Sequence, residues 1–83
     1  MVNTLDYRIV GRRCAEFRKE VLEVTLTELC NRTGQNIKNV SAFEHGRANN
    51  LKYLFFYLTL CDEKQKRQFA KYVFGGVENG GEN

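Results

Sequence analysis

Apolar residues recur along the first part of the chain at the spacing of one helix face. Five of them follow one another at intervals of three, four, three and four residues: Tyr7, Val10, Cys14, Phe17 and Val21. Because an α-helix turns once in about 3.6 residues, this spacing predicts an amphipathic helix from about Leu5 to about Val21. Charged residues fill most of the other positions, so the opposite side of this helix is expected to face solvent.

The next pattern predicts two short helices separated by a glycine. Thr25 and Glu28 match a capping box, in which each side chain bonds the backbone amide of the other at the start of a helix. Gly34 stands where this helix would end in a left-handed residue. Asn36 is a favourable cap for a following helix that ends before Gly46. Two helices of about eight to ten residues joined across so short a turn have helix-turn-helix geometry.

The rest of the chain predicts two further helices and a tail. From Leu51 to about Cys61 the apolar residues occupy all sides of a helix, which is typical of a helix covered on more than one side. Asp62 and Gln65 match a second capping box at the start of a fifth helix. The fold class is therefore all-α with five helices. We expect one domain over residues 1–75 and a disordered glycine-rich tail over residues 76–83.

The third predicted helix has two different sides. On a helical wheel Val40 and Phe43 point together and are expected to pack inward. The outward side holds four residues: Lys38, Ser41, Ala42 and His45. Small polar side chains suit a helix that enters the major groove of DNA, where lysine donates to guanine and an alanine methyl group meets thymine.

Three segments carry motifs with a shared spacing. Residues 10–18 are similar to the pattern L-G-x-x-I-x-x-x-R, with Val10 and Cys14 at its two apolar positions. Residues 24–30 are similar to L-T-Q-x-x-L-A, with Leu29 and Cys30 in place of the final leucine and alanine. Residues 34–46 follow G-V-S-x-x-x-I-S-x-x-E-x-G, with five matching positions: Gly34, Val40, Ser41, Glu44 and Gly46. Over about residues 5–60 the chain thus resembles the Cro and lambda-repressor-like (XRE) helix-turn-helix family. The resemblance implies five short helices, the third of which reads the major groove.

The resemblance also implies site residues. Side chains expected to face bases are Asn36, Ile37, Lys38 and Ala42, with Ser41 on the same side. Residues expected along the phosphate backbone are Thr25, Leu26, Thr27, His45, Arg47 and Asn49. For His45 the alternative is a surface histidine that complements the helix dipole. Arg18 and Glu44 match a partly buried ion pair that braces the first helix against the third.

Three positions depart from the family pattern. The glutamine at the start of the second helix is Leu26, and the segment between Arg18 and Leu26 is one residue longer than the commonest form. The third helix holds one lysine and no arginine.

Composition and charge narrow the function. The chain has 83 residues, enough for one small core, and a net charge of +3 that permits a nucleic-acid partner. We expect a cytoplasmic protein, because there is neither a long apolar run nor a signal-peptide pattern. The three cysteines lack metal-ligand spacing and are expected to pack as small apolar thiols. His45 has no catalytic partners at a familiar spacing, so neither an enzyme nor a cofactor is expected.

Together these features predict a sequence-specific double-stranded DNA-binding transcriptional regulator. We expect a repressor that acts as a homodimer on a palindromic operator, and by analogy a phage or mobile-element protein. The expected dimer surface is aromatic and belongs to the fourth and fifth helices: Phe56, Tyr57, Phe69, Tyr72 and Phe74. The alternative for these residues is a core closed within one chain. The alternative function is a protein-interaction module on the same fold, an antirepressor or an inhibitor of another DNA-binding protein.

Overall fold

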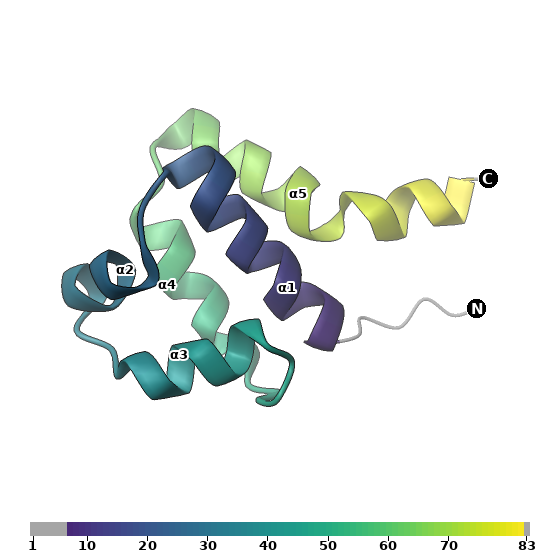
Figure 1. Cartoon of the computed structure of the whole chain (residues 1–83). Coiled ribbons are helices and arrows are strands. Elements are labelled where there is room, and N and C mark those ends of the chain that lie inside the picture. Colours follow the sequence, from purple (N-terminus) through teal and green to yellow (C-terminus); the bar gives the residue numbers. More distant parts are fainter. Residues whose placement is uncertain (1–6, 83) are drawn as a thin grey trace.

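The backbone of residues 7–82 and the side chains of residues 8–75 are described by a computed structural model. Within that part the chain forms five α-helices and no strand, in agreement with the all-α class (Figure 1). Two shorter helical turns are a π-helical turn at Arg18–Leu22 and a 3-10 turn at Leu51–Tyr53. The helices are α1 (Tyr7–Phe17), α2 (Leu26–Thr33), α3 (Ile37–Glu44), α4 (Leu54–Thr59) and α5 (Glu63–Glu82).

The helices surround one core to which each of them contributes. α1 packs against α3 and α5, while α2 packs against α3 and α4 (Figure 1). Aromatic rings join distant parts of the chain, since Phe17 of α1 lies edge-on to Phe69 of α5 with 5.0 Å between ring centroids. The buried apolar residues are Val10, Cys14, Phe17, Leu29, Cys30, Val40, Phe43, Tyr57, Phe69 and Val73.

The first helix changes its geometry before it ends. α1 continues into the π-helical turn, and the chain then leaves the helix at Glu23, whose φ of 56° lies in the left-handed region. A π turn closes its hydrogen bonds five residues apart and so takes in one residue more than an α turn. The predicted start at Leu5 lies outside the described residues.

The predicted caps around α2 and α3 are confirmed. Thr25 and Glu28 form the capping box, with 3.0 Å from the Glu28 amide to the Thr25 hydroxyl and 3.1 Å for the reciprocal bond. Gly34 ends α2 with a φ of 71°. Asn36 then caps α3 by accepting a bond from the Lys38 amide at 2.8 Å. The turn between the two helices is therefore residues 34–36.

The last two helices differ in part from the prediction. The predicted helix from Leu51 to Cys61 begins as the 3-10 turn and becomes α4 at Leu54. Asp62 and Gln65 cap α5 reciprocally, as expected, at 2.8 and 3.0 Å. α5 then runs to Glu82, through residues for which the sequence predicted disorder. Extending an existing helix costs far less than starting one, and no proline interrupts it. Asn83 lies outside the described residues.

Candidate functional site

α3 is held against α1 at a contact that only glycine permits. A Cβ atom at Gly11 would lie 1.9 Å from the backbone oxygen of Phe43, far inside van der Waals contact. Glycine inside a helix costs about 1 kcal/mol relative to alanine, so it calls for a packing reason. A glycine inside the predicted first helix is therefore the feature of the sequence that indicates a close approach. The contact at Gly11 fixes the distance between the backbones of α1 and α3.

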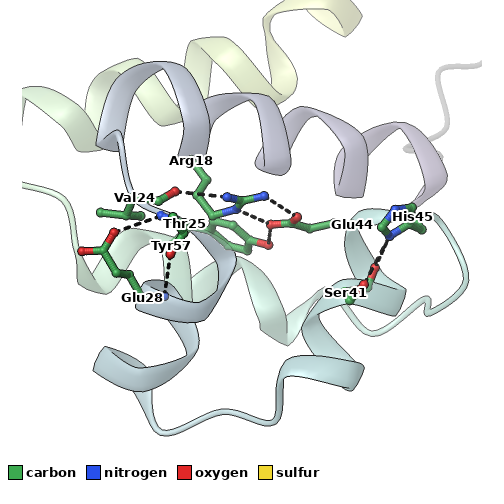
Figure 2. A network of polar contacts seen from close by, with 8 residues as sticks. All are labelled: Arg18, Val24, Thr25, Glu28, Ser41, Glu44, His45 and Tyr57. Atoms are coloured by element: carbon green, nitrogen blue, oxygen red, sulfur yellow. Dashed lines mark hydrogen bonds and ion pairs between the residues drawn. The ribbon is translucent and has the colours of Figure 1, made fainter.

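A buried ion pair links the same two helices (Figure 2). The Arg18 guanidinium donates from Nε to Glu44 Oε2 and from Nη2 to Glu44 Oε1, both at 2.9 Å. The two side chains are 7% and 4% exposed. Arg18 Nη1 also donates to the Val24 carbonyl at 3.1 Å, which ties the segment after the π-helical turn to the pair. The predicted ion pair between Arg18 and Glu44 is therefore present.

Tyr57 is a third member of this network that sequence reasoning assigned elsewhere. Its hydroxyl donates to Glu44 Oε2 at 2.6 Å, so one carboxylate joins α1, α3 and α4 (Figure 2). Burial raises the pKa of Tyr57, and the Glu44 carboxylate raises it further. Burial acts to lower the pKa of Arg18, but the hydrogen bond and charge of Glu44 outweigh it and raise that pKa. Tyr57 thus remains a donor and Arg18 a cation behind α3.

One side of α3 is buried and the other is open, as the helical wheel predicts. Val40 and Phe43 are completely buried. On the other side Lys38 is exposed and Ile37 is 44% exposed, whereas Ser41 and Ala42 are half-buried. These four residues line one shallow hollow, together with Leu26 of α2 and Arg47. Four of the five predicted base-facing residues therefore share one surface.

Asn36, the fifth of these residues, already uses half of its side chain. Its Oδ1 atom accepts bonds from the backbone amides of Lys38 and Asn39, at 2.8 and 3.4 Å. Only the amide nitrogen can then contact a partner. Recognition of adenine by asparagine needs both the oxygen and the nitrogen, so Asn36 can act only as a single donor while the cap is intact.

The predicted phosphate-contacting residues lie at the surface except for the half-buried Leu26, which lines this hollow together with Arg47. Thr27, Arg47 and Asn49 are exposed. Thr25 is also exposed, but its hydroxyl and the Glu28 carboxylate are engaged in the capping box. A phosphate at the start of α2 would therefore meet a carboxylate as well as hydroxyl groups.

His45 closes α3 through a bond to its own helix. Its Nδ1 atom lies 2.8 Å from the backbone oxygen of Ser41 (Figure 2). A carbonyl oxygen only accepts, so Nδ1 carries the proton and Nε2 of the neutral ring is an acceptor. His45 can therefore donate to a phosphate from Nε2 only when the ring is protonated.

α3 and the loop that follows it carry positive charge without exposed carboxylates. Between Glu28 and Asp62 the sequence holds one acidic residue, Glu44, and that residue is buried and paired. Three exposed cations lie in the same stretch and make no ion pair within the described residues: Lys38, Arg47 and Lys52. Lys52 lies over the Tyr53 ring. An anionic partner that approaches α3 therefore meets no exposed negative charge on α3 itself or on the loop that follows it.

The predicted dimer surface is wrong at two positions. Tyr57 and Phe69 are 0% and 2% exposed within the single chain, so neither is available to a second copy. Phe56, Tyr72 and Phe74 are half-buried. Among the residues that the structure describes, the most exposed large apolar side chain is that of Phe55, at 67%. It lines an apolar hollow between α4 and α5 with Leu51, Leu54, Leu58 and Phe74.

The cysteines carry no visible chemistry of their own. Cys14 and Cys30 are buried, Cys61 is half-buried, and all three are free thiols. Burial raises the pKa of each, so they are held as neutral thiols. Among the residues that the structure describes, no three histidine, cysteine, aspartate or glutamate side chains gather where a metal ion could bind. In the same part of the chain, no helix combines the length and apolarity needed to cross a membrane.

Comparison with known proteins gives no relative for this chain. No protein-family model matches it, and no match is found among curated proteins or among solved structures. The arrangement of α2 and α3 is thus the feature from which function has to be inferred.

Proposed function

We propose that this chain binds double-stranded DNA in a sequence-specific manner and acts as a transcriptional repressor of the Cro and lambda-repressor-like helix-turn-helix type. The observation that carries the proposal is the exposed side of α3. It presents Ile37, Lys38, Ser41 and Ala42 from a helix whose other side is completely buried. With its side chains an α-helix is about 10–12 Å across. The major groove of B-DNA is also about 12 Å wide, so a helix of this kind enters it.

The chemistry of this side matches base edges in the major groove. Lys38 can donate to O6 or N7 of guanine, and Ser41 can donate or accept. The Ile37 side chain and the Ala42 methyl group can pack against the methyl group of thymine. Asn36 adds a single donor from its amide nitrogen. Direct base contacts of this kind discriminate by about 1–3 kcal/mol each, enough in combination to select a sequence.

The buried contacts behind α3 support the proposal because they hold this helix in a fixed position. Base reading requires that the reading helix keeps its position, because a small shift breaks hydrogen bonds to base edges. The Gly11 contact and the network around Glu44 fix α3 to α1 and α4. Both sets of contacts lie behind α3, on the side away from its exposed residues, and so leave those residues open.

We further propose that the chain acts as a homodimer on a palindromic site. A single module of this size buries only about 600–1,000 Å² against DNA, so a second copy is needed for tight binding. Two copies would place their α3 helices in half-sites about 34–36 Å apart. The apolar hollow around Phe55 offers exposed surface for this contact, and sedimentation of Phe55→Glu against the parent chain tests it.

Selection of bound duplexes from a random pool tests DNA recognition directly. We expect the parent chain to enrich a palindromic consensus. Lys38→Glu should weaken binding to that consensus by roughly 5- to 150-fold, the equivalent of one base contact of about 1–3 kcal/mol. Lys64→Glu is the matched control, because Lys64 is an exposed lysine on α5, away from the hollow on α3. A pool without enrichment, or equal effects of the two variants, would contradict the proposal.

The second candidate function is a protein-interaction module on the same fold. The apolar hollow between α4 and α5 favours it, because it is exposed and its lining is almost entirely apolar apart from Lys52 and Lys66. In this case Lys38→Glu should leave partner binding unchanged, whereas Phe55→Glu should abolish it. Lys38→Glu thus separates the two functions, whereas Phe55→Glu tests the contact at the α4–α5 hollow that both of them use.

A further inference from the structure

A second basic hollow lies beside α1. It is bordered by the flank of α1 and by the ends of two other helices, the start of α2 at Leu26 and the end of α3 at His45. Three of its lining residues are exposed cations of the first helix and its π-helical turn: Arg8, Arg12 and Lys19. From the sequence alone, the arginines that follow Gly11 could contact phosphate, although such residues more often form a solvated face, and Lys19 has no role assigned there.

The cations follow one line along the helix. Positions 8, 12, 15 and 19 are spaced four, three and four residues apart, so they share one helix face. Eleven residues span about 16 Å along a helix axis. One DNA strand carries a phosphate for every 3.4 Å or so of duplex axis, so this face is long enough to meet more than one phosphate.

The charges of Arg12 and Lys19 are not neutralised within the described part of the chain. Arg12 and Lys19 make no hydrogen bond or ion pair within the described part of the chain. Glu44 lines the same hollow, but its carboxylate is occupied by Arg18 and Tyr57 and its side chain is only 4% exposed. Because Arg12 and Lys19 are exposed and the Glu44 carboxylate is paired with Arg18, the hollow carries net positive charge.

The hollow on α1 adjoins the hollow on α3. Leu26 lines both of them, and His45 at the end of α3 lines the one on α1. A single ligand surface that contacts the exposed side of α3 would therefore also pass the flank of α1. Beyond Lys19 the positive line ends, because Glu20 and Glu23 line the next hollow along the chain.

We propose that Arg12 and Lys19 bind the phosphodiester backbone of the same duplex that α3 reads, so that the DNA interface extends across α2 onto α1. This inference rests on the proposed function. The cations are spread along a helix flank instead of converging on one point. Such a line matches a linear polyanion better than a small free anion, which is held best by converging donors.

The size of the effect follows from counterion release. Each phosphate neutralised by a cation contributes about 0.9 to the slope of log K against log salt. If that contribution vanishes near 1 M salt, one contact strengthens binding about eightfold at 0.1 M salt. Losing both cations should therefore weaken binding by roughly sixtyfold at that salt concentration, equally for consensus and unrelated duplexes.

The test is a salt titration of duplex binding with Arg12→Ala, Lys19→Ala and the double variant. The consensus duplex selected by the parent chain and a scrambled duplex serve as ligands. Lys64→Ala is the control for removing an exposed lysine from another helix. We expect the slope to fall by about 0.9 for each single variant and about 1.8 for the double variant. The ratio of consensus to scrambled affinity should not change. Thermal unfolding should match the parent chain, since both side chains are exposed.

The outcomes separate this inference from the proposed function. If the parent chain binds its consensus but the slopes of the α1 variants equal that of Lys64→Ala, the inference is overturned while DNA recognition by α3 stands. If the variants change the ratio of consensus to scrambled affinity, the residues act on bases and the phosphate assignment is wrong. If the parent chain binds no duplex, the proposed function fails and the inference fails with it.

Discussion

Removing Arg18 should destabilise this protein more than any exposed substitution, because Arg18 neutralises a buried carboxylate. In Arg18→Met, Glu44 would keep one hydrogen bond, from Tyr57, with its side chain 4% exposed in the present structure. Removing one partner of a buried ion pair costs about 3–5 kcal/mol. A domain of this length has a total stability of roughly 4–12 kcal/mol. The substitution should thus remove about a quarter or more of that stability.

The assays are urea unfolding and thermal unfolding, both followed by far-ultraviolet circular dichroism. Arg12→Met is the matched control, since it removes an exposed arginine from the same helix and should change stability by less than about 0.5 kcal/mol. The midpoint of thermal unfolding of Arg18→Met should fall by at least about 12 °C, taking 4 °C per kcal/mol as the smallest shift for a domain of this size.

A second substitution separates the buried charge from lost packing. Arg18→Met combined with Glu44→Gln removes the charge, and the glutamine oxygen can still accept from Tyr57. This double variant should therefore be more stable than the sum of the two single effects predicts, by about 1–3 kcal/mol. Equal stability of Arg18→Met and Arg12→Met, or additive effects in the double variant, would refute the explanation.

Three further predictions concern the helix contact, the buried protons and the start of α2. Gly11→Ala should lower the free energy of unfolding by about 1–3 kcal/mol, because the new Cβ would lie 1.9 Å from the Phe43 oxygen. This loss outweighs the better helix propensity of alanine, and unchanged urea unfolding would contradict it. Burial raises the pKa of Cys14 and Tyr57 above their usual values of 9.0 and 10.0, so the stability that these protons give is fully present below pH 9 and lost as the pH rises. Above that pH the unfolding free energy should fall by up to about 1.4 kcal/mol per pH unit for each group, with a shallower fall in Tyr57→Phe. Glu28→Gln keeps the capping box and removes a negative charge beside the proposed phosphate contacts, so duplex affinity should rise more at low than at high salt; an equal change at both would speak against a phosphate there.

The helix boundaries were the most predictable part of the fold because caps act over three or four residues. Thr25 with Glu28, Gly34, Asn36 and the box at Asp62 each form where the sequence predicts them. The apolar period likewise identified Val10, Cys14 and Phe17 as one buried face of α1. Such signals lie within one helix and need no knowledge of its neighbours.

Predictions that required a neighbour were less secure. The apolar residues of α4 surround the helix, so the sequence could not decide which of them the rest of the chain covers. The structure buries Tyr57, which was predicted at the dimer surface, and leaves Phe55 67% exposed. The hydroxyl of Tyr57 finds its partner, Glu44, 13 residues away along the chain. The ion pair of Arg18 with Glu44 was predicted from family resemblance and not from any local pattern.

The sequence by itself determined where α2 starts and stops, where α3 and α5 start and which side of α3 is apolar, because backbone capping and helical periodicity are short-range effects. Only the tertiary structure decided which side of α4 is covered and how closely α1 approaches α3 at Gly11. It also decided that the hollow beside the cations of α1 adjoins the hollow on α3, since Leu26 lines both. Those properties depend on the crossing of helices far apart in the chain, and a crossing is fixed by the packing of all side chains at once.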